Sequence, residues 1–540
     1  MRGVLRLALF QARRDRVLLP VWILGIALLG FATSSAVAAQ FGDEAARTAI
    51  ITLAASNPAF LFLRGLPDGI GSGAVVFFQC YAFTAVLAGL MSTFLVVRHT
   101  RTDEELGRSD LLDGTIPLPR AASLAGTLLL GGGANLALAL FVAIGFIAAG
   151  LPVPGALGAG AAVGAVGVFF VAAAAAVAQA MPSGRSANAA ASGLVGAAYL
   201  VRGIGDALGT PEADLLHVTS AWPAILSPIG WGQRSRPFTE PDLLPLLALF
   251  AAAFVVAAVA VLIRQRRDLG ASLLPPREGR ERAGVGGTSL VGLAWRLQRS
   301  TLTGWCLGAA ALGAVAGMLG PLVAETVSGV APLKELISRL VPGGRAELID
   351  VFTAALLGMA GLFAAAAGIQ AVLRLRAEEA EGRAELLLGA PMSRSRWLGA
   401  NLFIAASSAV MISGTAGVSA SVGLGVSGVT SVPAGSLVPA ALAHVPAALV
   451  FLTATSLVFA TAPRLSIPLG WGMLVTGLIL GEFGELFGLP LWVQDLSPFR
   501  HSPAMPVEPF DPAGAAALTL VGAVLATLAG YAISRRDLTA

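Results

Sequence analysis

Twelve segments of the chain are long and apolar, and polar or arginine-rich stretches separate them. A helix that crosses about 30 Å of hydrocarbon needs roughly 20 apolar residues, which these segments supply. The sequence therefore predicts an all-α, polytopic membrane protein with about twelve transmembrane helices. The predicted spans are residues 18–39, 73–97, 122–150, 155–181, 187–207, 243–263, 300–324, 351–373, 397–427, 436–462, 465–487 and 513–534.

Two of these spans carry charged residues. Arg202 and Asp206 stand four positions apart near the end of the fifth span, and Glu482 and Glu485 stand in the corresponding eleventh span. Charged side chains at membrane depth usually face a bundle interior or water. One interpretation is an outer gate on a transport pathway. The alternative is a local ion pair in the interfacial zone, where a charge costs less.

Composition agrees with a membrane protein. Of the 540 residues, 56% are hydrophobic and only 12% are charged, and the mean hydropathy is +0.80. A soluble globular chain has about 25% charged residues. A water-soluble enzyme and a disordered chain are therefore excluded. The sequence offers no constellation typical of a metal site or a catalytic nucleophile, and no nucleic-acid surface is expected.

The distribution of arginine predicts the orientation in the membrane. The net charge is only +4, but most of the basic residues fall in the N-terminal arm and in alternate loops. Basic loops stay on the cytoplasmic side. We therefore expect a multi-pass protein of a bacterial cell membrane, with both termini in the cytoplasm. The N-terminal apolar stretch is too long for a cleaved signal and is expected to be retained.

The chain contains an internal repeat. Each half starts with Arg-x-x-Leu-x-x-Trp, has Trp-x-x-x-Leu-Ser-Pro before its last span, and ends with Arg-Arg-Asp-Leu. Six spans per half would give both halves the same orientation, with a transport pathway between them; a stable helical scaffold is the alternative. We predict a first half over 1–269, a cytoplasmic linker over 270–290, and a second half over 291–540.

The most informative repeat is a charged loop after the second span of each half. An arginine and a glutamate precede a Gly-Arg pair and a leucine, with helical spacing between the charges. A glycine turn and a short leucine-bearing helix would form a knob suited to a protein partner with two equivalent sockets. A plain cytoplasmic loop is the alternative. The residues predicted to dock are Arg101, Glu104, Gly107, Arg108 and Leu111 in the first copy, and Arg376, Glu379, Gly382, Arg383 and Leu386 in the second.

These repeated loops and the Arg-rich start resemble the permease subunits of type 2 ATP-binding-cassette (ABC) exporters, in particular the large actinobacterial permeases described as polyketide-antibiotic exporters. The resemblance implies that the two loops are coupling regions for separate ATPase subunits, two copies per permease. It also implies ATP-driven export of a hydrophobic compound such as an antibiotic, a drug or a lipid.

The chain lacks the glycine-rich phosphate loop of an ATPase. Its single lysine, Lys334, lies in APLKELIS, which does not match GxxxxGK[ST]. We therefore expect a transporter subunit without enzymatic activity or a cofactor of its own, with ATP and Mg²⁺ bound by the partner. The rival interpretation is an ion-coupled multidrug carrier of the major facilitator type, which also has six plus six spans. Acidic residues in the first spans, expected for proton coupling, are absent.

Overall fold

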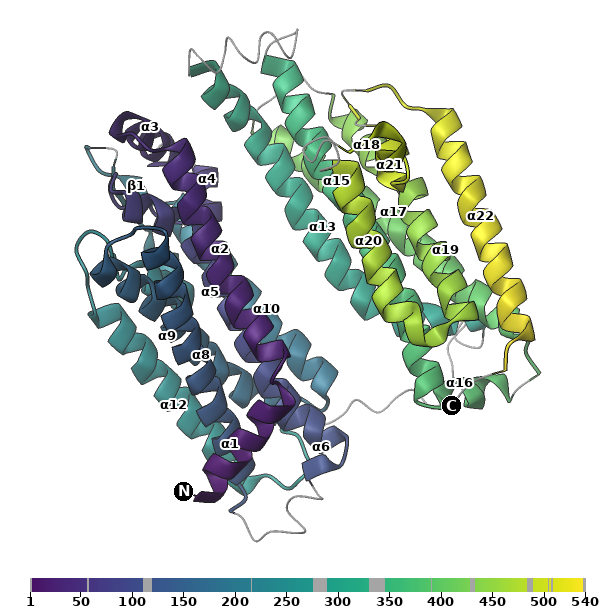
Figure 1. Ribbon diagram of the computed structural model, residues 1–540, viewed down its shortest axis with the longest axis horizontal. Coiled ribbons are helices and arrows are strands. Elements are labelled where there is room, and N and C mark those ends of the chain that lie inside the picture. Colours follow the sequence, from purple (N-terminus) through teal and green to yellow (C-terminus); the bar gives the residue numbers. More distant parts are fainter. Residues whose placement is uncertain are drawn as a thin grey trace. The chain divides into compact units, whose positions relative to one another are not determined.

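The computed structural model divides into two compact units, Met1–Gly279 and Arg280–Ala540, and each is a bundle of helices (Figure 1). The boundary falls within the segment predicted as a linker. Residues 275–288 lie outside the described part of the chain, so the linker itself stays a prediction. The structure describes residues 2–55, 58–109, 119–214, 216–274, 289–329, 345–389, 391–427, 433–482, 489–503, 505–506 and 508–537.

In the first unit, the six long helices match the six predicted spans within a few residues. They are α2 (Leu18–Gln40), α5 (Ser72–Val97), α8 (Ala122–Ala148), α9 (Val153–Ala180), α10 (Gly184–Ala207) and α12 (Leu244–Arg266). The shorter elements are α1 (Arg2–Arg14), α3 (Glu44–Ala55), α4 (Pro58–Arg64), the π-helix η1 (Arg98–Thr102), α6 (Asp103–Glu105), the 3₁₀ helix η2 (Trp222–Leu226) and α11 (Pro228–Gln233). Strands β1 (Thr210–Pro211) and β2 (Val218–Thr219) pair in an antiparallel hairpin.

The second unit is also built mainly from long helices. Its long helices are α13 (Leu290–Gly329), α15 (Arg345–Ala380), α17 (Arg394–Val426), α19 (Val445–Thr461), α20 (Ser466–Glu482) and α22 (Pro512–Arg535). Its short elements are α16 (Arg383–Leu388), α18 (Leu437–Leu442), α21 (Leu491–Gln494) and the 3₁₀ helices η3 (Ala434–Ser436), η4 (Pro463–Leu465) and η5 (Pro498–His501).

Eleven segments in the described part of the chain are long and apolar enough to cross a membrane. A helix satisfies all its backbone hydrogen bonds internally, as the hydrocarbon region requires. The predicted all-α, polytopic architecture is therefore confirmed. Helix α10 is not among the eleven, although it forms where the span 187–207 was predicted. Its polar residues make it less apolar than the other long helices.

Glycines permit a close helix contact in the second unit. Gly313 and Gly317 are four residues apart on α13, and a Cβ atom at either position would overlap a backbone carbonyl of α17, at Ala416 or Ala420. Small residues at this spacing let membrane helices approach closely. The two glycines therefore allow α13 and α17 to pack with their backbones in close contact.

The two halves differ at their start. In the first unit α1 and α2 are separate helices, whereas α13 runs without interruption through the matching Arg-x-x-Leu-x-x-Trp segment. Between α1 and α2, Asp15 accepts hydrogen bonds from Arg98 and His99. Gln298 occupies the matching position in the second half and instead donates to Asn401. The start motif is thus repeated in sequence but not in local structure.

Candidate coupling site

The first charged loop continues α5 as a helical extension. The extension consists of η1 and α6, and Arg101 donates to Glu104 at 3.0 Å, which confirms the predicted pairing at helical spacing. Gly107 then adopts a φ angle of +69°. Residues with a Cβ atom rarely adopt this left-handed conformation, so the glycine ends the helix and turns the chain. Leu111 lies outside the described residues.

The second charged loop has the same turn. Helix α15 ends at Ala380, Gly382 has a φ angle of +71°, and α16 follows. Helix α16 carries Leu386, which is 82% exposed. A leucine this exposed at the end of a bundle is available to a partner.

Glu104 is buried rather than exposed. Its side chain is only 7% exposed, and both carboxylate oxygens accept from Nη2 of Arg267 at 2.6 and 2.7 Å. Arg264 lies 3.7 Å from the same carboxylate. The sequence predicted a charged flank available to a partner. The structure instead directs Glu104 towards arginines from the end of α12.

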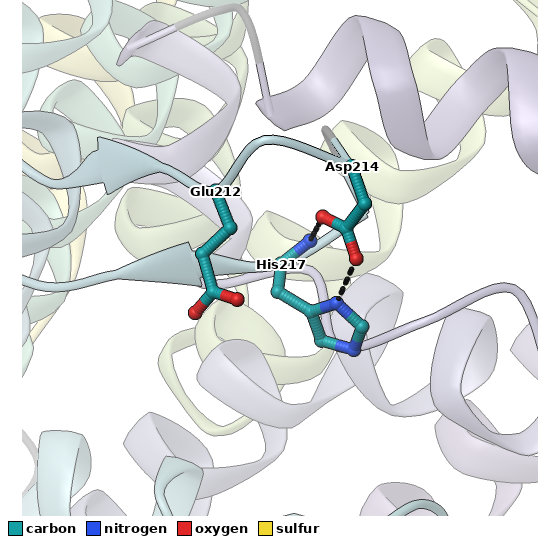
Figure 2. Close-up of side chains that lie close together, drawn as sticks. All are labelled: Glu212, Asp214 and His217. Atoms are coloured by element: carbon teal, nitrogen blue, oxygen red, sulfur yellow. Dashed lines mark hydrogen bonds and ion pairs between the residues drawn. The ribbon is translucent and has the colours of Figure 1, made fainter.

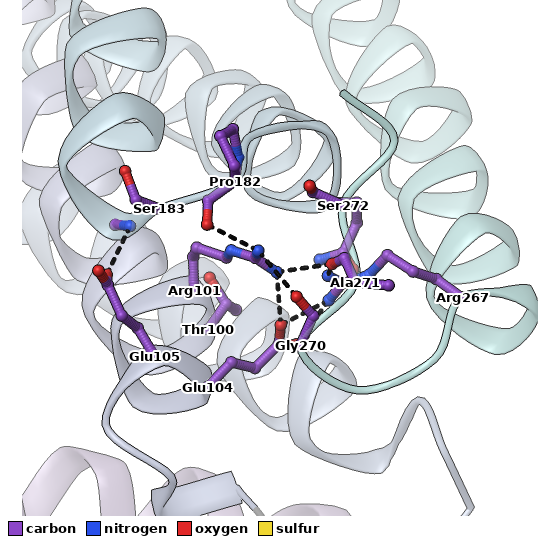
Figure 3. A network of polar contacts seen from close by, with 12 residues as sticks. Thr100, Arg101, Glu104, Glu105, Pro182, Ser183, Arg267, Gly270, Ala271 and Ser272 are labelled. Carbon is purple, nitrogen blue, oxygen red and sulfur yellow. Dashed lines mark hydrogen bonds and ion pairs between the residues drawn. The ribbon is translucent and has the colours of Figure 1, made fainter. Parts of the chain in front are cut away.

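Arg101 is also buried and acts as a junction between three segments (Figure 3). Its guanidinium donates to the carbonyl oxygen of Pro182, in the α9–α10 loop, at 2.8 Å. It also donates to Gly270 and Ala271, which follow α12, at 3.2 and 2.8 Å. Nearby, Glu105 accepts from the backbone N–H of Gly184 at 2.9 Å. The segment is thereby held to both neighbouring loops.

The second half repeats these contacts at the matching motif positions. Both carboxylate oxygens of Glu379 accept from Nη2 of Arg536 at 2.6 Å, and the Glu379 side chain is 3% exposed. Arg376 donates through Nε to the carbonyl oxygen of Pro463 at 3.0 Å, in the α19–α20 loop. The buried glutamate, and the arginine three residues before it, therefore each have one equivalent partner in the two units.

The other charged residues of the predicted docking set, Arg108 and Arg383, lie on the surface. Arg108 is about half exposed and its Nη1 donates to Asp103 at 3.1 Å. Arg383 is similarly exposed and pairs with Glu381, while Leu106 is exposed beside Gly107. The predicted set thus separates into a buried group and an exposed group.

A polar cluster that the sequence analysis did not identify holds α1 against the first loop. Arg14 donates to both carboxylate oxygens of Asp103, at 2.6 and 3.1 Å, and Asp15 bonds to His99 and Arg98. Burial would raise the pKa of Asp15, but the contacts with His99 and Arg98 outweigh it and hold that pKa below its ordinary value. Because these partners are 83 to 89 residues apart, no local pattern signals them.

The first candidate gate pair is a buried ion pair. The Arg202 side chain is 0% exposed and donates to Asp206 at 2.9 Å and to the carbonyl oxygen of Phe62 at 2.6 Å. It also lies over the Tyr199 ring, 4.8 Å from its centroid. Gln233 donates to Asp206 at 3.2 Å. The pair links α10 to α4 and α11, as a local ion pair would, and its gating role stays a prediction.

The second candidate gate pair cannot be placed in the same way. Glu482 is the last residue of α20, and its side chain lies outside the described part of the chain, as does all of Glu485. The predicted equivalence with Arg202 and Asp206 therefore stays a prediction.

Three potential metal ligands that the sequence analysis did not single out lie together on the β1–β2 hairpin. Ligand atoms of Glu212, Asp214 and His217 are all within 4.8 Å of one another (Figure 2). However, Asp214 already accepts from His217 Nδ1 at 2.8 Å and from the backbone N–H of Leu216 at 2.9 Å. These hydrogen bonds lower the pKa of Asp214, and through them the exposed carboxylate stabilises the turn between β1 and β2.

An apolar groove runs between α13 and α17. Its volume is about 670 Å³, and its lining is largely valine, methionine and glycine with Thr415 and Ser419. Drug-sized ligands occupy cavities of about 300–1,000 Å³ with mainly apolar walls and a few polar groups. However, Val418, Val422 and Val426 are more than half exposed, so the groove is an open apolar face of the bundle that falls within this size range without enclosing a ligand.

The two helical bundles, with their many long apolar helices, define a multi-pass membrane protein. A family model described as the C-terminal domain of the multidrug efflux system permease Rv1217c matches residues 288–533. The chain is also 34% identical over 537 residues to the multidrug efflux system permease protein Rv1217c of Mycobacterium tuberculosis, which covers 99% of this chain and 94% of the relative. The chain belongs to this family of efflux permeases, which confirms the resemblance to ABC-type permeases.

Membership of this family makes the protein a transporter subunit in a membrane. It does not support the alternative of a major facilitator carrier.

Proposed function

We propose that this protein is the membrane-spanning subunit of an ATP-driven exporter and that its two charged loops dock separate ATP-binding subunits. The observation that carries the proposal is the pair of glycine-turned segments at Gly107 and Gly382, each fixed by a buried glutamate and each bearing exposed charge. A rigidly held, exposed segment can transmit a push from a partner. The family to which the chain belongs supports an efflux role.

The energy source in this proposal is a partner protein. The sequence has no glycine-rich phosphate loop, so ATP and Mg²⁺ would be bound by the partner. Two equivalent segments suit two copies of the ATP-binding subunit. The arginine-rich loops on the docking side favour a cytoplasmic position for that side and for both termini in a bacterial cell.

The proposed cargo is a hydrophobic compound, such as an antibiotic, a drug or a lipid-like molecule. The groove between α13 and α17 supports this choice because its walls are largely apolar. The relative from Mycobacterium tuberculosis is named as part of a multidrug efflux system, which agrees with a hydrophobic cargo. Closure of the ATP-bound partner subunits would push the two charged loops together, reorient the two six-helix halves and move the hydrophobic compound outward.

Co-purification with the ATP-binding subunit tests the docking assignment. The tagged permease is co-expressed with an ABC ATPase subunit from the same source and is extracted in mild detergent. Reversing the exposed charges, with Arg108→Glu and Arg383→Glu, should abolish both co-purification and ATP-dependent efflux of a fluorescent hydrophobic antibiotic. A matched control reverses two arginines outside the segments, with Arg266→Glu and Arg535→Glu, and should retain both activities.

Two outcomes would contradict the proposal. If the double reversal at Arg108 and Arg383 keeps full co-purification and efflux, the exposed segments do not dock the ATPase. If efflux in vesicles persists without ATP and stops when an ionophore collapses the ion gradient, the permease is ion-coupled.

A further inference from the structure

The Arg-Arg-Asp-Leu motif that ends each half has so far served only as a marker of the repeat. In both units, however, its second arginine binds the buried glutamate of the charged loop. Arg267 contacts Glu104 across 163 residues of sequence, and Arg536 contacts Glu379 across 157 residues. We propose that Arg267 and Arg536 are positioning residues that join each charged loop, around Gly107 and Gly382, to the last helix of its own half. This inference rests on the proposed function.

The geometry in the first unit is that of a strong link. One guanidinium nitrogen of Arg267 lies within 2.7 Å of both Glu104 oxygens, and the same arginine donates to the Ala271 carbonyl oxygen. The Arg267 and Glu104 side chains are both almost completely buried. Charge-assisted hydrogen bonds are about twice as strong as neutral ones, and exclusion of water strengthens them further.

In the second unit, Arg536 connects four helices at one end of the bundle. Besides Glu379 at the end of α15, it donates to the carbonyl oxygen of Phe459 on α19 at 2.8 Å. Its guanidinium lies over the Phe459 ring, 5.2 Å from the centroid. Arg394, at the start of α17, donates to the carbonyl oxygen of Arg536 itself. A movement of the loop therefore reaches the end of α22 through buried contacts.

The first arginine of each motif behaves differently. Arg266 and Arg535 are exposed, and Arg535 lies over the Tyr531 ring of its own helix. Arg266 and Arg535 carry the same charge as Arg267 and Arg536 and lie at the same helix ends. Within the part of the chain that the structure describes, neither of them contacts a charged loop. They provide matched controls for the second arginine.

The last helices need such a link if they are to follow the loops. Helices α12 and α22 are among the least buried of the long apolar helices, and they pack mainly on α9 and α19 rather than on α5 and α15, which lead into the charged loops. Packing alone therefore does not tie α12 and α22 directly to the helices that lead into the charged loops. A buried Arg–Glu pair at its end provides the connection, and loss of one partner leaves an uncompensated buried charge.

The test separates positioning from docking and from folding. The permease and its ATP-binding subunit are purified together and reconstituted in liposomes, and efflux of a fluorescent hydrophobic antibiotic is measured with ATP hydrolysis in the same sample. The variant carries Arg267→Gln and Arg536→Gln, and the control carries Arg266→Gln and Arg535→Gln. We expect the variant to retain the ATPase and its hydrolysis, but to export about tenfold less antibiotic per ATP.

A lysine variant distinguishes loss of the arginine contacts from a failure to fold. Arg267→Lys with Arg536→Lys keeps the charge but loses the planar fork, so it should accumulate in the membrane and show an intermediate export per ATP. The inference is overturned if the export per ATP of the lysine and glutamine variants equals that of the control. It is also overturned if these variants lose the ATPase subunit while the control keeps it, because the arginines then act in docking. Loss of the subunit from the unaltered permease would instead refute the proposed function.

Discussion

The ion pair between Arg202 and Asp206 permits a quantitative test of what charge does inside the first unit. In the variant Arg202→Met, Asp206 keeps only the neutral donor Gln233, at 3.2 Å, and the carbonyl oxygen of Phe62 loses its 2.6 Å donor. Both members of the pair are almost fully buried. Removing one partner of a buried ion pair typically costs about 3–5 kcal/mol, because the remaining charge is unpaired.

The double variant Arg202→Met with Asp206→Leu removes both charges. Replacing a buried pair by apolar side chains of similar volume is often neutral, so the double variant should be more stable than the single one. Thermal unfolding in detergent measures the difference. We expect the single variant to unfold about 6–10 °C below wild type, given about 2 °C per kcal/mol for a unit of this size. The double variant should recover most of that loss.

Two results would refute this reasoning. The first is a single variant as stable as wild type, which would mean that the pair contributes little. The second is a double variant less stable than the single one, which would mean that Asp206 has other essential partners. Efflux by the double variant tests the gate: normal export by a stable protein would exclude a gating role for Arg202 and Asp206.

Two further predictions concern the charged loops. Gly107→Ala and Gly382→Ala should each destabilise the protein by about 1 kcal/mol, because both positions have a left-handed φ angle. The control Gly399→Ala, within α17, should be neutral or stabilising, and the melting temperatures of the three variants measure the difference. Asp15→Asn should destabilise the protein at neutral pH, and the difference in stability from wild type should shrink as the pH falls below the ordinary Asp pKa of 3.8. The reason is that the lowered pKa of Asp15 in the folded state contributes stability only while the carboxylate is ionised, so a difference independent of pH would contradict this assignment.

Local properties of the sequence located the spans and the loop turns. The predicted span 73–97 corresponds to helix Ser72–Val97, and 513–534 to Pro512–Arg535, because the apolar length that a membrane requires is a property of contiguous residues. The Arg101–Glu104 pair was predictable for the same reason, since residues three apart share a helix face. The glycine turns follow from the one residue type that adopts a left-handed conformation without a steric penalty.

The sequence alone determined that this is an all-α membrane protein, and it located the charged loops that turn at Gly107 and Gly382. Only the tertiary structure decided which of those charges face outward. Glu104 and Glu379 are buried because arginines more than 150 residues away meet them at the end of the last helix. Spacing along the chain predicts which side chains share a helix face. Partners from separate helices meet only through the packing of the bundle, and no local pattern encodes that packing.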